Sequence, residues 1–252
     1  MIFQIKKIGL LLIVGFLLSL NIACAQHRIN ISSKQEIVDY YLDSLKLELR
    51  KKWPKNKTVN LVFHGHSVPT GYLTKGVVDR VNSYPFQTLK KINDHYPYSV
   101  VNAITTSIGG EQAEQGAKRF KKEVLTYKPN VIFIDYALND RSMGLERAKV
   151  AWEKMIVEGL EYGAKVILLT PTPDLKEDIN SEESKLAKHS KQIRKLAKKY
   201  KVGLVDSYAI FKKLSEKKPL KRYMAQNNHI NQKGHQFVAD AIFEYFKIAP
   251  KK

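Results

Sequence analysis

Short apolar runs alternate with longer amphipathic segments along almost the whole 252-residue chain. The clearest run is VIFIDY at residues 131–136, which is nearly continuous and rich in β-branched side chains. Such runs are typical of parallel strands covered on both faces. Strands are predicted at residues 58–63, 99–104, 131–136, 165–170 and 202–205. Helices are predicted at residues 35–52, 84–95, 111–127, 145–162, 181–200 and 233–246. This order predicts an α/β fold with a five-stranded parallel sheet between layers of helices.

Small and polar residues follow the predicted strands. Ser67, Gly110, Asn139 and Asp174 each come after a strand, and His229 lies in the loop before the last helix. Ligands of open parallel sheets bind outside the carboxyl ends of the strands. We therefore expect these residues to share one edge of the sheet.

Four short motifs stand at these positions: GHS at 65–67, IGGE at 108–111, ALND at 137–140 and HINQKGH at 229–235. In this order they resemble the conserved blocks of the SGNH hydrolases, a branch of the GDSL esterase and lipase superfamily. The resemblance covers nearly the whole chain after residue 25. It implies a three-layer, flavodoxin-like α/β/α fold and hydrolysis of ester bonds.

The residues of these motifs suit that chemistry. A serine hydroxyl becomes a good nucleophile when a base removes its proton, and His229 is the candidate base for Ser67. The negative oxygen of the tetrahedral intermediate needs preorganised donors. The backbone N–H groups of Ser67 and Gly110 and the side-chain amide of Asn139 are the candidates for this oxyanion hole.

Three positions depart from the family pattern. His66 replaces the aspartate beside the nucleophile, and Ala137 replaces the glycine of the third block. Gln226 replaces the aspartate three residues before the histidine, and an amide cannot stabilise imidazolium as a carboxylate does. Three interpretations follow. Gln226 or a main-chain carbonyl orients His229; another carboxylate, Asp174 or Glu111, takes over; or the protein has become a binding module.

A zinc site is the alternative chemistry at the same edge. His64 and His66 are two residues apart, and His229 and His235 lie in and after the last loop. No Cys or acidic residue completes a tetrahedral set. We therefore expect no metal and no cofactor.

The first 25 residues resemble an export signal. Lys6 and Lys7 precede an apolar stretch at residues 8–20, and small residues at 23–25 offer a cleavage site. The stretch is short for a membrane span, although an uncleaved anchor is an alternative. A second alternative is lipidation of Cys24, which is the single cysteine. We predict a signal peptide at 1–25, an exported hydrolase domain at 26–252 without disulfides, and no stable membrane span after cleavage.

The formal net charge of +19 favours anionic partners. Nucleic acid is not expected, because no basic stretch is interleaved with aromatic residues as stacking platforms. The remaining interpretations are solvated lysine-rich helices and an acidic polysaccharide substrate.

Together these features predict an exported serine esterase that removes acetyl or other small acyl groups from a carbohydrate. Tyr72, Lys75 and Arg80, after the nucleophile, and Arg141, beside Asn139, are candidates for holding an acidic sugar. The alternatives are a lipase or thioesterase acting on acyl chains, and a catalytically weak carbohydrate binder. The sequence leaves the oligomeric state open.

Overall fold

The structure is a computed structural model that describes residues 38–248. The predicted signal peptide and the first residues of the predicted domain lie outside this range. Among the described residues, no helix combines the length and the apolar character that crossing a membrane requires.

A five-stranded parallel sheet forms the centre of the fold, with the order β2-β1-β3-β4-β5. On β1, which lies between β2 and β3, Val62 is opposite Ile104 on one side and Ile132 on the other. The predicted α/β class and the parallel sheet are confirmed. The strands are β1 (Thr58–Gly65), β2 (Val100–Thr105), β3 (Val131–Asp135), β4 (Lys165–Leu169) and β5 (Gly203–Val205).

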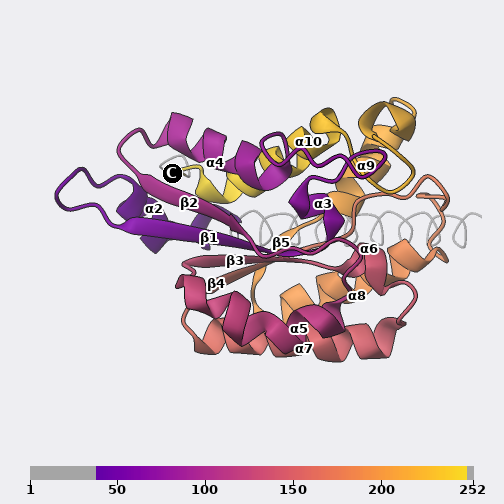
Figure 1. Ribbon diagram of the computed structural model, residues 1–252, viewed down its shortest axis with the longest axis horizontal. Helices are drawn as coiled ribbons and strands as arrows, with labels where there is room; N and C mark the ends of the chain where they lie inside the picture. The colour runs from indigo at the N-terminus through magenta and orange to yellow at the C-terminus, as the bar shows by residue number, and fades with distance from the viewer. Residues whose placement is uncertain (1–37, 249–252) are drawn as a thin grey trace, which may run out of the picture.

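Helices cover both faces of the sheet, as Figure 1 shows. One core contains the stacked rings of Phe63 and Phe133, whose centroids are 4.3 Å apart, and the other contains the buried Trp152. The helices against the first core are α2 (Asp43–Leu49), α4 (Tyr84–His95), α9 (Ser207–Ser215) and α10 (Gln232–Phe243). Those against the second are α5 (Ala113–Glu123), α7 (Leu145–Glu161) and α8 (Lys185–Tyr200).

Several helix boundaries differ from the predictions. The first helix does not run continuously to residue 52, because a turn at residues 41–42 precedes α2. Helix α5 begins at Ala113, shortly after the predicted start near residue 111, since Gln112 caps the helix and Gly110 has a φ of +79° in the preceding turn. Helix α8 begins at Lys185 because the Ser184 side chain accepts a hydrogen bond from the Ala187 N–H.

Two four-residue helices at strand ends were not predicted: α3 (Ser67–Thr70) after β1 and α6 (Ala137–Asp140) after β3. Figure 1 places both at the same end of the sheet. Short 3₁₀ helices occur at Leu125–Tyr127, Leu220–Tyr223 and Glu244–Phe246. The carboxyl edge of the sheet therefore carries compact turns.

Candidate active site

Strand β1 leads directly to Ser67, which is the first residue of α3. The chain passes so close to β3 at this point that a Cβ on Gly65 would clash with the main-chain oxygen of Asp135. Helix α3 ends at Gly71, which has a φ of +94° and donates its N–H to the Ser67 carbonyl. The Ser67 side chain thus lies at a sharp strand-to-helix turn.

The imidazole of His229 lies directly beside this serine, with Nε2 2.8 Å from Ser67 Oγ. His229 belongs to the loop between Tyr223 and α10. A bridge between Met224 and Ile230 closes the base of the loop, and the Ala225 N–H donates to the His229 carbonyl over 2.8 Å. The structure therefore brings together two residues that are 162 positions apart in sequence.

The other ring nitrogen of His229 faces two groups. Nδ1 lies 3.2 Å from the main-chain oxygen of Leu73 and contacts Nε2 of the Gln226 amide. A carbonyl oxygen can only accept, so the tautomer that donates from Nδ1 to Leu73 leaves a lone pair on Nε2 toward Ser67. Two N–H groups cannot bond each other, so in that tautomer the Gln226 amide turns its oxygen to Nδ1.

Leu73 is held in a small hairpin that spans residues 71–79. The Leu73 N–H donates to the Val77 carbonyl and the Asp79 N–H donates to the Gly71 carbonyl, each over 2.8 Å. Because both ends of the hairpin are hydrogen-bonded, the Leu73 carbonyl has a fixed position relative to α3.

Burial lowers the pKa of His229 below its usual value of 6.5. The nearby His66 lowers this pKa further, whereas the Leu73 hydrogen bond raises it. His229 is therefore mostly neutral near pH 7, as a proton acceptor must be.

The two other candidate oxyanion donors lie in the turn before α5 and in the short helix α6, and these two segments are bonded to each other. Asn139 Nδ2 donates to the Glu111 carbonyl over 3.0 Å, and Gln112 Nε2 donates to the Asn139 carbonyl over 3.1 Å. The Ile108 N–H donates to the Gly65 carbonyl over 3.0 Å, which fixes the loop before Gly110 against β1. One of the two Asn139 Nδ2 protons remains available to a ligand.

Asp140, the last residue of the third motif, stabilises these segments through its buried carboxylate. Its carboxylate accepts from the Ala113 N–H and from Trp152 Nε1, both over 2.8 Å. Burial raises the pKa of Asp140 to about 6. This side chain ties the start of α5 to α7 and so supports the turn that contains Gly110.

The two carboxylates considered as substitutes for the missing aspartate are engaged elsewhere. Asp174 accepts from Arg141 Nη1 over 2.9 Å. Glu111 forms an ion pair with Arg119 and accepts from the Tyr136 hydroxyl over 2.8 Å. Within residues 38–248, the contacts of His229 Nδ1 are with Gln226 and Leu73 instead.

Of the predicted substrate-binding residues, the structure places Tyr72 beside the histidine and the others in separate surroundings. The Tyr72 ring centroid lies 6.2 Å from that of His229, and Lys75 is exposed at the tip of the hairpin. Arg141 lines a cavity of about 340 Å³ together with Asn139. Arg80 is tied to the Thr105 hydroxyl and lies over the Phe86 ring.

The four histidines considered for zinc have separate surroundings. His64 bonds Thr106 and faces the Tyr136 hydroxyl, and its pKa is lowered to about 3 by burial. His66 faces Asp135, and Nδ1 of His235 accepts from the Tyr84 N–H. No three His, Cys, Asp or Glu side chains in the described part of the chain are grouped as a metal site.

Two contacts at this site involve residues that sequence reasoning did not identify. Leu73 contributes a carbonyl, which every residue type has, so its side chain gave no signal. Asp135 lies opposite Gly65 in the sheet register and faces His66. The one sequence signal for Asp135 was its position as an acidic residue at the end of an apolar strand.

The model of the GDSL-like lipase/acylhydrolase family matches residues 63–237. No curated protein sequence matches the chain.

Two solved structures share the fold at low sequence identity. One is a two-domain esterase active on acetylated mannans, at 18% identity and a TM-score of 0.68; the alignment covers 82% of this chain and 52% of that one, so this chain spans about half its length. The other is Axe2, an acetylxylan esterase from Geobacillus stearothermophilus, at 16% identity and a TM-score of 0.64, with 75% and 94% covered. Catalytic mutants of Axe2 replace a serine, an aspartate and a histidine, the last two being three residues apart.

The family match spans well over half of the chain and contains the four motifs on one sheet edge. The SGNH resemblance is thus confirmed: the chain belongs to the GDSL-like lipase/acylhydrolase family and is a hydrolase of ester bonds.

Proposed function

We propose that the protein is an exported serine esterase that removes acetyl or other small acyl groups from a carbohydrate. The observation that carries this proposal is the 2.8 Å separation between His229 Nε2 and Ser67 Oγ at the carboxyl edge of the sheet. Family membership adds the reaction class, which is ester hydrolysis.

In the proposed reaction, His229 Nε2 removes the proton from Ser67 Oγ as the oxygen attacks the ester carbonyl carbon. The resulting oxyanion accepts hydrogen bonds from the Ser67 and Gly110 N–H groups and from the Asn139 amide. His229 then returns the proton to the leaving sugar hydroxyl. Water, activated by the same base, releases the acyl group from Ser67 as the free acid.

The base in this proposal is held by a main-chain carbonyl in place of a carboxylate. Leu73 O fixes Nδ1–H and hence the tautomer, which is one of the two tasks of the family aspartate. The second task is to stabilise the imidazolium that forms during the reaction, and Gln226 has no charge with which to do this. We therefore place the enzyme among serine-histidine dyads with reduced activity.

This arrangement predicts a gain of activity from Gln226→Asp. A carboxylate at this position raises kcat/KM by about 10-fold to 100-fold, because it stabilises imidazolium while Leu73 already secures the tautomer. It also raises the pKa of His229, since a nearby negative charge favours the charged form. In the wild type, the pKa of His229 is lowered, so activity persists as pH falls to 6.5 and is lost only at lower pH. In Gln226→Asp this loss begins at higher pH.

The matched control for this variant is Asn227→Asp, which adds the same charge at the next, exposed position of the loop. Rates with p-nitrophenyl acetate across pH 4–9 are the measurement. An equal gain in Asn227→Asp, or no gain in Gln226→Asp, contradicts the assigned role of residue 226.

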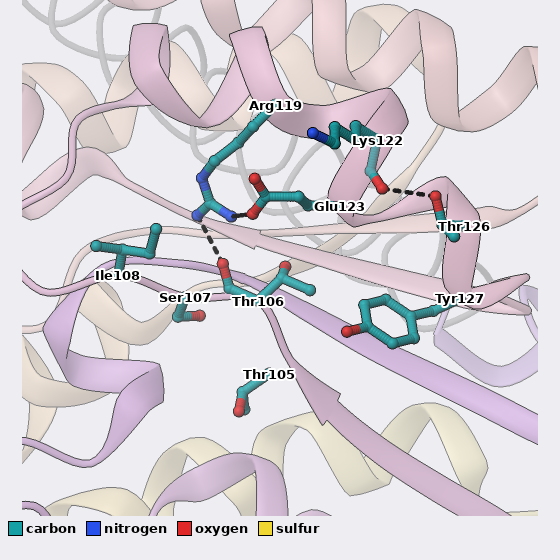
Figure 2. A pocket seen from close by; sticks show the side chains of 9 residues that line it. All are labelled: Thr105, Thr106, Ser107, Ile108, Arg119, Lys122, Glu123, Thr126 and Tyr127. Atoms are coloured by element: carbon teal, nitrogen blue, oxygen red, sulfur yellow. Dashed lines mark hydrogen bonds and ion pairs between the residues drawn. The ribbon is translucent and has the colours of Figure 1, made fainter.

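A hollow beside the edge strand, lined by both polar and apolar groups, supports a carbohydrate substrate. It has a volume of about 420 Å³ and lies between the segment after β2 and helix α5 (Figure 2). Arg119 and Lys122 of α5 lie on its wall, and the Tyr127 side chain, 47% exposed, offers a flat apolar face. Ser107 and Ile108, which precede Gly110, form another part of the wall. Hydroxyl, cationic and aromatic groups together suit a sugar chain better than an acyl chain.

We expect Tyr127→Ala to raise KM for an acetylated polysaccharide about fivefold, which corresponds to about 1 kcal/mol of lost binding. The kcat on the polymer and the rate with p-nitrophenyl acetate remain unchanged, because the hollow is separate from the reacting atoms. Tyr162→Ala is the control, since Tyr162 is similarly exposed at 45% but lies after α7. Equal KM values in all three proteins contradict a role of the hollow in substrate binding.

The substrate class is tested with acetylated neutral and acidic glycans against p-nitrophenyl esters of increasing acyl length. Turnover that favours acetylated glycans supports the proposal, and a preference for acidic glycans supports roles for Tyr72, Lys75 and Arg141. Turnover that rises with acyl length favours a lipase or thioesterase. Glycan binding without turnover favours a binding protein.

Export is proposed from residues 1–25 alone. Expression in the native cell type followed by mass spectrometry of the amino terminus is the test. A mature protein that begins at Gln26 supports simple cleavage. A lipid-modified Cys24 contradicts simple cleavage, and an intact Met1 contradicts export.

A further inference from the structure

His66, which stands where the family has aspartate, is completely buried directly before Ser67. Its Nδ1 accepts the Val68 N–H over 3.2 Å and so caps α3. Because Nδ1 supplies its lone pair to this bond, the neutral ring carries its proton on Nε2.

That proton faces a buried carboxylate from the neighbouring strand. Nε2 of His66 lies 3.4 Å from Asp135 Oδ1, and the two side chains are 1% and 3% exposed. Neither atom has a hydrogen-bond partner within residues 38–248, so each is left facing the other at ion-pair distance. The other carboxylate oxygen of Asp135 accepts from the Tyr84 hydroxyl over 2.9 Å. Burial and Asp135 raise the pKa of Tyr84, so it remains a donor.

We propose that His66 and Asp135 form a positioning pair that replaces the family aspartate beside the nucleophile. Asp135 supplies the buried carboxylate from β3, and His66 connects that charge to the first turn of α3. Nδ1 is bonded to the turn and Nε2 faces the carboxylate, so the pair orients the turn that carries Ser67 Oγ and the Ser67 N–H. The inference rests on the proposed role of Ser67 as nucleophile.

This pairing predicts that restoring the family aspartate at residue 66 lowers activity. In His66→Asp, two carboxylates share one buried site, which raises the pKa of one of them. Above that pKa their repulsion displaces the turn, and we expect kcat to fall at least about tenfold at pH 8, with KM nearly unchanged. Below that pKa, one carboxyl is protonated and the loss of kcat is smaller. The other titratable groups around the pair are Tyr84 from α4, Asp140 from α6 and His229 from the loop before α10.

The same pKa shift acts on stability. The raised carboxyl pKa in folded His66→Asp exceeds its unfolded value of about 3.9. Stability relative to the wild type is therefore lost as pH rises from about 4, and the loss is complete above the raised pKa. Thermal unfolding at several pH values measures this change.

Removing the second charge distinguishes positioning from simple damage. We expect Asp135→Asn to impair the wild type and to improve His66→Asp, so that the double variant has a higher kcat than His66→Asp and a flatter pH profile between pH 5 and 8. His66→Asn, which keeps a cap for the Val68 N–H, serves if His66→Asp fails to fold, and an intermediate kcat is expected. His95→Asp, at the exposed end of α4, is the control for the exchange itself.

Three outcomes overturn the pairing: His66→Asp equals the wild type at all pH values, Asp135→Asn gives no rescue, or His66→Asn retains full kcat. Ser67→Ala is measured alongside them. If turnover survives Ser67→Ala, the proposed nucleophile is wrong and the positioning role falls with it. If turnover is lost in Ser67→Ala but no rescue occurs, the pair alone is wrong.

Discussion

Ser67→Ala reduces the hydrolysis of p-nitrophenyl acetate by about 10⁴-fold or more, because the residual rate comes only from binding and the oxyanion donors. The fold is retained, since the change removes one oxygen from a side chain that is 7% exposed. His229→Ala causes a loss of similar size. The double variant is no worse than either single variant, because the two groups act as one unit.

Ser107→Ala is the control for this experiment. Ser107 also has a hydroxyl at this edge of the sheet, where it donates to the Phe63 carbonyl over 3.0 Å. We expect its rate to stay within about threefold of the wild type, the range of a modest loss in packing. Turnover in Ser67→Ala comparable to that of Ser107→Ala assigns the chemistry to another residue. Covalent labelling by a fluorophosphonate, with the modified peptide identified, provides a second measurement.

The second large effect is expected in Asn139→Ala. Loss of one oxyanion donor lowers kcat by about 10²-fold to 10³-fold, whereas KM changes little because the contact strengthens in the transition state. Steady-state kinetics with p-nitrophenyl acetate measure both constants.

Asn139 also supports its own loop through the Glu111 carbonyl, so a second variant is needed. Gln112→Ala removes the bonds from Gln112 Nε2 to the Asn139 carbonyl and to Ser142 Oγ, yet it leaves the Asn139 amide intact. We expect a loss below about tenfold in Gln112→Ala. A comparable kcat in the two variants shows that loop order, and not a donated hydrogen bond, accounts for the effect.

The sequence predicted the features that depend on periodicity and chain order. The apolar run at 131–136 predicted a buried parallel strand, and the strand-helix alternation placed Ser67, Asn139 and His229 on one edge. The four-residue helices α3 and α6 escaped prediction because a segment of that length has no periodicity. The start of α5 was misplaced because Gly110 and Glu111 form a turn that the cap at Gln112 follows.

Pairings between strands were beyond the reach of one sequence. Asp135 faces His66 because β1 and β3 are neighbours with Gly65 opposite Asp135, a register that depends on the packing of the whole sheet. The sequence showed that an aspartate was missing beside the nucleophile. It did not show which carboxylate lies nearby.

The hairpin at residues 71–79 has a consequence for natural variation. A carbonyl oxygen survives every point substitution at Leu73, whereas inserting or deleting one residue between Gly71 and Asp79 moves that oxygen away from His229. If the dyad operates as proposed, loop length is inherited more strictly than side-chain identity. Relatives whose histidine is also oriented by this main-chain carbonyl then show a fixed spacing from the nucleophile to the hairpin. Motif searches that require an aspartate before the histidine overlook such relatives.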